Sequence, residues 1–106
     1  ADEAEVTILV RGVYDEEGTP LELRLGLGAT VLEVKGLVQQ RLAAAPPPSE
    51  QRLIFCGKVC DDARPLREVL LMMDTSHPQT FHLVLSGESM ERAREFRAVR
   101  QRAAAA

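Results

Sequence analysis

The chain has 106 residues and a formal net charge of −3, a size that suits one compact domain with a short extension. This charge provides no domain-wide basic field, so we do not expect nucleic acid as a partner. No apolar run approaches the roughly 20 residues that span a bilayer, and the acidic start is unlike a signal peptide. We therefore expect no membrane contact by this chain, although a parent protein could carry an anchor elsewhere.

The two cysteines, Cys56 and Cys60, lie close together and have no second cysteine or histidine cluster to complete a structural zinc site. A disulfide between them would close only a tiny loop, with little entropic benefit. We expect two reduced thiols, which favours an intracellular setting. Cys60 is interpreted as a small core residue, and Cys56 as a turn thiol that Arg52 and Lys58 could partly activate. No cofactor or metal site is indicated.

The N-terminal part predicts a β-hairpin that follows a disordered segment at residues 1–5. Residues 6–11 are β-branched and aliphatic, with Val6, Ile8 and Val10 on one face of the predicted strand. Residues 12–18 contain turn-forming glycine and aspartate. Apolar and charged residues then alternate over 21–25, as in a half-buried strand, and Gly26 is expected to end it.

A helix is predicted to begin after Thr30, because Thr30 and Glu33 form a capping box in which each side chain binds the other residue's backbone N–H. Residues 46–48 are prolines, so the helix must end before them, within 43–45. Its apolar stripe is expected to lie across the hairpin: Val31, Val34, Leu37 and Val38. Its polar side is expected to face water: Lys35, Gln39 and Arg41.

The second half predicts further strands. Residues 52–55 form a strand that ends in a turn at Gly57, and residues 59–60 permit another brief strand. Residues 66–73 are apolar and locally helical or irregular. Residues 81–85 alternate, with Phe81 and His82 on opposite faces. The predicted order is two strands, one main helix, and two or three strands.

Residues 86–106 form a charged extension with helical character and an alanine-rich end. We favour a solvated linker helix leading into a further domain of a longer protein. A second interpretation docks Met90, Phe96 and Val99 onto the domain. In a third, the arginines between positions 92 and 102 contact acidic partners or RNA.

Three segments together resemble ubiquitin. They are residues 51–58 (Gln-Arg-Leu-Ile-Phe-Cys-Gly-Lys), residues 82–85 (His-Leu-Val-Leu), and residues 30–35 at the helix start. The resemblance covers roughly residues 6–85, and only Lys35 and Lys58 correspond to ubiquitin's lysines. It implies the α+β class and the β-grasp fold, a mixed sheet packed on one main helix.

The chain also departs from ubiquitin. It contains no Gly-Gly pair, and Leu85 is followed by Ser86 and Gly87, so the terminal chemistry needed for conjugation is unsupported. Residues 71–80 are a few residues longer than the family's counterpart. The resemblance is therefore to non-conjugated ubiquitin-like domains embedded in larger proteins.

The resemblance implies a protein-binding face formed by Ile54, His82 and Val84. Strand alternation independently places Ile54 opposite in sense to Leu53, and His82 and Val84 opposite to Leu83. The residues expected at its rim are Gly57, Lys58, Arg52 and, from the first hairpin loop, Val13. Alternatively, these are ordinary strand residues that form an inert surface or are covered by the C-terminal segment. His82 has no partner fixed by a motif for acid–base catalysis.

We therefore expect a monomeric, non-catalytic ubiquitin-like module. Its expected partners are proteins with ubiquitin-binding helical domains, or proteasome or unfoldase subunits, which it would recruit to a parent protein. The expected location is cytoplasmic or nuclear, or the cytosolic face of a membrane-anchored parent. The alternatives are a structural or autoregulatory domain that packs on the parent's own chain and, less favoured, a processed modifier.

Overall fold

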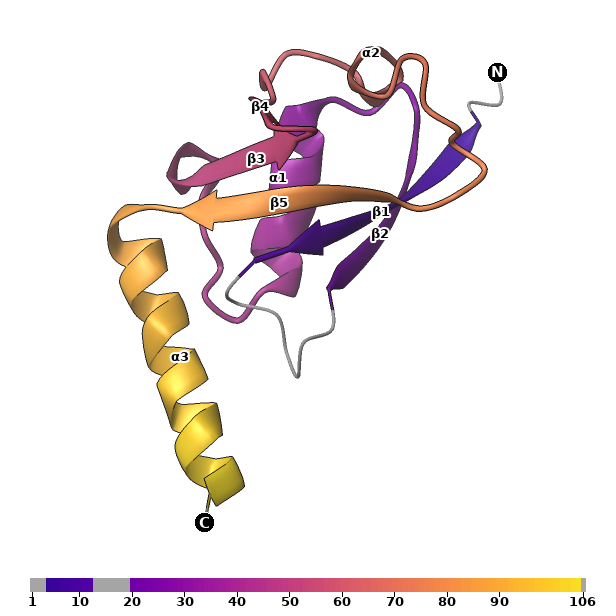
Figure 1. Ribbon diagram of the computed structural model, residues 1–106. Helices are drawn as coiled ribbons and strands as arrows, with labels where there is room; N and C mark the ends of the chain where they lie inside the picture. The colour runs from indigo at the N-terminus through magenta and orange to yellow at the C-terminus, as the bar shows by residue number, and fades with distance from the viewer. Residues whose placement is uncertain (1–3, 13–19, 106) are drawn as a thin grey trace.

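Alternation of apolar residues along the strands places one face of a five-stranded sheet against helix α1 (Figure 1). The computed structural model describes residues 4–12 and 20–105. Its strands are β1 (Glu5–Arg11), β2 (Leu21–Gly26), β3 (Gln51–Phe55), β4 (Lys58–Val59) and β5 (Gln79–Leu85). Its helices are α1 (Val31–Arg41), the 3-10 turn η1 (Pro48–Glu50), α2 (Leu66–Val69) and α3 (Gly87–Ala105).

The sheet is mixed and has the strand order β2-β1-β5-β3-β4. Strand β1 pairs antiparallel with β2 and parallel with β5, and β3 pairs antiparallel with both β4 and β5. A mixed sheet packed on one main helix confirms the predicted α+β, β-grasp class. The topology places the chain's first and last strands side by side at the centre of the sheet.

Several strand limits differ from the sequence-based expectation, since β3 begins at Gln51, β4 covers Lys58–Val59 and β5 begins at Gln79. Strand β1 begins at Glu5, within the segment 1–5 that was expected to be disordered, because Glu5 pairs with Gly26 and the Ala4 carbonyl accepts a hydrogen bond from Leu27. Gly26 is accordingly the last residue of β2, one position beyond the predicted strand 21–25. Most of the predicted turn, residues 12–18, lies outside the described residues.

The start of α1 is the predicted capping box. The Glu33 amide donates to Thr30 Oγ1 at 3.2 Å, and the Thr30 amide donates to Glu33 Oε2 at 2.8 Å. The helix ends at Arg41, slightly before the expected stretch 43–45, because Leu42 is already extended while its amide still caps the Val38 carbonyl.

The core lies between α1 and the inner face of the sheet. Val31, Val34 and Val38 are fully buried, as the predicted stripe requires. The Phe55 and Phe81 rings pack with centroids 4.8 Å apart, which adds an aromatic contact to an otherwise aliphatic core. Among the described residues, the other fully buried aliphatic side chains of the core are Val6, Ile8, Leu23, Leu53 and Leu66.

The prediction that Lys35 faces water is wrong. Lys35 is only 6% exposed, and its ammonium group pairs with Asp62 Oδ1. Residues 61–65 cross the start of α1, where the Leu32 amide donates to the Asp62 carbonyl at 3.1 Å. This crossing brings the Asp62 carboxylate to the end of the lysine side chain, which is buried with its charge paired.

A buried glutamine ties β3 to the preceding segment. Gln51 Nε2 donates to the Lys35 carbonyl at 2.8 Å and to the Pro46 carbonyl at 2.9 Å. These bonds hold the proline-rich crossover between α1 and the start of β3. They thereby set where the exposed side chains of β3 lie relative to the helix.

Helix α3 is attached to the domain at its start and projects away from it further on (Figure 1). The Ser89 amide and hydroxyl both donate to Glu50 Oε1, and Arg92 Nε donates to the Ala44 carbonyl at 2.9 Å. Gly87 has a φ of +62°, and a Cβ there would lie 3.3 Å from Glu50 Cδ, so glycine suits this junction. Ser89 is completely buried.

The described part of α3 combines two of the expected arrangements. Met90 packs against the core cluster, as the docking interpretation expected, whereas Phe96 and Val99 remain exposed. The first turns are therefore part of the domain, and residues 94–99 of the following turns face solvent. Among the described residues, no helix is long and apolar enough to cross a membrane.

Replacing Glu50 by alanine is expected to release the start of α3. The two hydrogen bonds from Ser89 hold the pKa of the Glu50 carboxyl below its ordinary value. A carboxyl with a lowered pKa stabilises the docked state above its unfolded pKa and loses that effect as the pH falls through its folded pKa. The amide shifts of Ser89 and Arg92 are therefore expected to change in Glu50→Ala at neutral pH. In the chain without the substitution, they are expected to change only on acidification.

The matched control is Glu91→Ala, which removes an exposed carboxylate from α3, the helix that contains Ser89. It is expected to leave the amide shift of Ser89 close to its original value. An unchanged Ser89 amide in Glu50→Ala would contradict the role assigned to this carboxylate.

Candidate protein-binding face

The register of β3 and β5 brings the predicted site residues together on one side of the sheet. Ile54 is the Cα partner of His82, and Arg52 is the partner of Val84. Partners across a ladder project to the same face. The residues that alternate with them, including Leu53 and Leu83, are buried against α1. Arg52, Ile54, His82 and Val84 therefore share the outer face, and we call these four residues the outer-face patch.

The outer-face patch is open to solvent in the described structure. Val84 is 44% exposed, His82 and Arg52 are exposed, and Ile54 is half-buried between them. Arg11 of β1 is the parallel partner of His82, so a second arginine adjoins the patch. The result is an apolar centre bordered by cationic side chains. Helix α3 does not cover Val84.

Gly57 and Lys58 were expected at the rim of the binding face. Both lie at the edge of the sheet, but Lys58 does not share a face with Ile54. Cys56 and Gly57 have φ values of +50° and +79°, as in a type I′ hairpin turn, and this geometry favours glycine at position 57. The turn pairs Lys58 with Phe55, whose ring packs in the core. Lys58 consequently projects to the α2 side of the β3–β4 hairpin. Val13 lies outside the described residues.

Val59 joins the outer face, although the sequence reasoning did not assign it there. It is the Cα partner of Ile54 and is 61% exposed. The available signal was the turn at Gly57, because a two-residue turn after Phe55 places position 59 opposite position 54. The apolar surface of the outer face therefore extends from Val84 through Ile54 to Val59.

The two thiols differ in environment. Cys60 is half-buried against the core, and burial raises the pKa of its thiol despite the nearby charge of Lys35. A raised pKa reduces the thiolate fraction and hence nucleophilicity at neutral pH. Cys56 is exposed in the turn, and both cysteines are free. Within the described ranges, no group of three or more His, Cys, Asp or Glu side chains could hold a metal ion.

The mixed sheet packed on one main helix defines a ubiquitin-like β-grasp domain. The model of the Ubiquitin family matches residues 8–87, which is most of the chain. The chain therefore belongs to the ubiquitin family, whose domains are generally non-catalytic. No curated protein matches this chain.

Proposed function

We propose that this domain is a non-catalytic interaction module that recruits ubiquitin-receptor, proteasome or unfoldase proteins to a parent protein. The outer-face patch is its binding surface. The observation that carries the proposal is the register in which Ile54 lies opposite His82 while Val84 remains exposed two positions further along β5. Such partners are cytosolic or nuclear, and the two free thiols are compatible with that location.

The chemistry of the face favours a helical partner with an apolar stripe flanked by carboxylates. Ile54 and Val84 supply apolar contact area, and Arg52 and Arg11 supply charge at its border. Opposite charges at the border of an interface raise the rate of association more than the affinity. Because the apolar centre is small, binding is expected to be weak and reversible.

The residues that follow β5 help to choose between this proposal and its alternatives, the cover of the face by the chain's own helix and the processed modifier. Val84 remains exposed although α3 begins at Gly87, which favours a partner other than this helix as the occupant of the face. The residues after β5 are helical, and the Ser86 amide donates to the Glu50 carbonyl at 3.0 Å. This differs from the flexible Gly-Gly tail that conjugation uses, so we do not favour the processed modifier.

Titration of the labelled chain with a ubiquitin-binding helical module tests the proposal. Amide shifts are expected within residues 52–55 and 81–85. Val84→Ala is expected to weaken binding by about tenfold, a typical effect for a central apolar contact. Because Val84 is partly exposed, this variant is expected to keep its fold.

Leu32→Ala is the matched control, because Leu32 is similarly exposed but lies on α1. It is expected to bind like the original chain. Shifts that avoid residues 52–55 and 81–85, or full binding by Val84→Ala, would show that the face is wrongly assigned. Masking of the same amides in the longer parent would instead support the autoregulatory alternative.

A further inference from the structure

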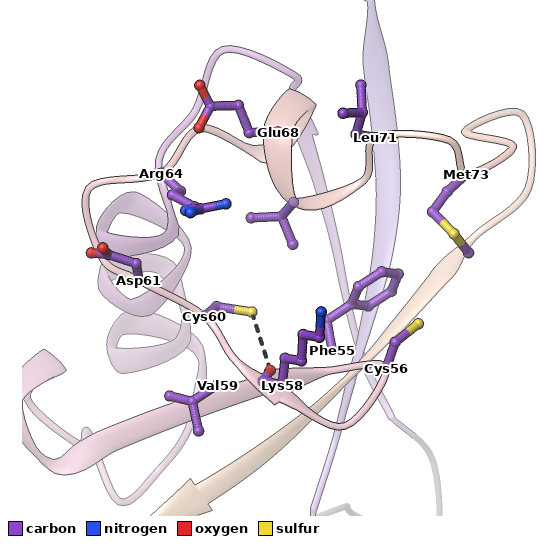
Figure 2. Close-up of a pocket in the computed structure, with 11 residues that line it drawn as sticks. Phe55, Cys56, Lys58, Val59, Cys60, Asp61, Arg64, Glu68, Leu71 and Met73 are labelled. Carbon is purple, nitrogen blue, oxygen red and sulfur yellow. Dashed lines mark hydrogen bonds between the residues drawn. The ribbon is translucent and has the colours of Figure 1, made fainter.

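A hollow separate from the outer-face patch lies between the β3–β4 hairpin and α2 (Figure 2). Its volume is about 530 Å³, within the range of small-ligand and side-chain pockets. The ring of Phe55 and the side chain of Val69 contribute apolar lining. Val59, Cys60, Leu71 and Met73 also line it.

The cationic and anionic side chains around this hollow point in different directions. Figure 2 shows the ends of Lys58 and Arg64 directed toward the hollow, whereas the carboxylates of Asp61 and Glu68 are directed away from it. No ion pair of Lys58 or Arg64 is found among the described residues. The hollow thus combines an apolar lining with two available cations, an arrangement that complements an anionic group attached to an apolar one.

Apolar surface continues outside the hollow. Leu71 is 70% exposed, and Met73 is also exposed at the same edge. Val59 lines the hollow and is the ladder partner of Ile54, so this apolar surface reaches the outer face. Exposed apolar side chains gathered around a concavity are typical of interaction sites. An occupant that contacts both the hollow and its rim must be larger than a small anion.

We propose that this hollow binds a protein segment in which an acidic side chain lies one or two positions from a bulky aliphatic or aromatic side chain. The apolar side chain enters between Phe55 and Val69. The carboxylate meets Lys58 and Arg64. Flexible Met73 adapts the rim to the side chain that enters. This binding site uses residues outside the outer-face patch and does not require that patch to bind.

Titration of the labelled chain with three short peptides tests the proposal. The probe is acetyl-Ser-Glu-Leu-Phe-Glu-Ser-amide. One control peptide replaces both glutamates by glutamine, and the other replaces leucine and phenylalanine by alanine. With the probe, saturable amide shifts are expected at Val59, Arg64 and Leu71. The glutamine peptide is expected to bind about two- to fivefold more weakly, as for exposed ion pairs, and the alanine peptide is expected not to bind.

Two variants of the chain separate charge from shape. Arg64→Glu is expected to weaken binding of the probe peptide by about fivefold or more, because the substitution reverses the charge. Val69→Phe fills the hollow from the α2 side and is expected to abolish binding. Arg94→Glu, on the projecting part of α3, is the charge-matched control and should bind normally. Val84→Ala should also bind the probe peptide normally, because Val84 belongs to the outer-face patch. A result that contradicts the hollow as a binding site is therefore distinguishable from one that contradicts the outer-face patch.

The proposal is overturned if the probe causes no shifts at the hollow, or if the glutamine peptide binds equally well. Unchanged binding by Val69→Phe would also overturn it. A titration with decanoate distinguishes a peptide site from a site for small amphipathic anions. If decanoate shifts the same amides and saturates them at a lower concentration than the probe peptide does, the hollow is a site for small amphipathic anions. Self-association that perturbs these amides without peptide would assign it to a second copy of the chain.

Discussion

Replacing Phe81 by alanine is expected to lower the free energy of unfolding by about 3–5 kcal/mol. Phe81 is completely buried in the central strand β5, and its ring packs on Phe55 at a centroid distance of 4.8 Å. Truncation removes the apolar transfer energy and leaves a cavity that α1 and the sheet cannot fully close. It also removes one of the few aromatic side chains of the core.

Urea denaturation followed by circular dichroism measures this loss. Met72→Ala is the control, because Met72 is 94% exposed and its truncation is expected to change the free energy by no more than about 0.5 kcal/mol. If Phe81→Ala does not fold, Phe81→Leu is expected to show a smaller but measurable loss of about 1–2 kcal/mol. Equal stability of Phe81→Leu and the original chain would contradict the core described above.

Asp62→Ala is expected to lower the free energy of unfolding by about 1–3 kcal/mol. Asp62 pairs with Lys35, whose side chain is 8% exposed, so the substitution leaves a buried ammonium without its carboxylate. The loss is expected to be smaller than for a fully buried pair, because the Asp62 side chain is 49% exposed and water can partly replace it.

A double-mutant cycle isolates the energy of this pair. Lys35→Met keeps the buried stem and removes the charge. The Lys35→Met/Asp62→Ala variant is therefore expected to recover much of the stability that Asp62→Ala loses. Denaturation curves of the four proteins provide the measurement. A loss below about 0.5 kcal/mol in Asp62→Ala, with additive effects in the double variant, would mean that the pair contributes little.

The local features of this chain were predictable because short-range physics determines them. The capping box depends only on Thr30 and Glu33, which are three residues apart. The burial of Val31, Val34 and Val38 follows from the helical period. The shared outer face of Ile54 and His82 required one further step, the pairing of β3 with β5, which the resemblance to ubiquitin supplied.

Most of the features that sequence reasoning missed depend on contacts between distant segments. The water-facing position assigned to Lys35 was wrong because Asp62, 27 positions away, supplies a carboxylate over α1. Glu50 caps the start of α3 across 39 positions, which no helical pattern within residues 86–106 could show. The hollow between β4 and α2 likewise needs two segments to be placed in space before its lining can be recognised.

By itself, the sequence determined the approximate strand and helix segments, the apolar face of each main element and the family to which the domain belongs. Period-2 and period-3.6 patterns carry that information within a few residues. Only the tertiary structure decided which charges are paired, how the start of α3 is attached to the domain, and that Arg11 adjoins His82. Those outcomes depend on strand register and on the packing of loops, which join residues that no local pattern connects.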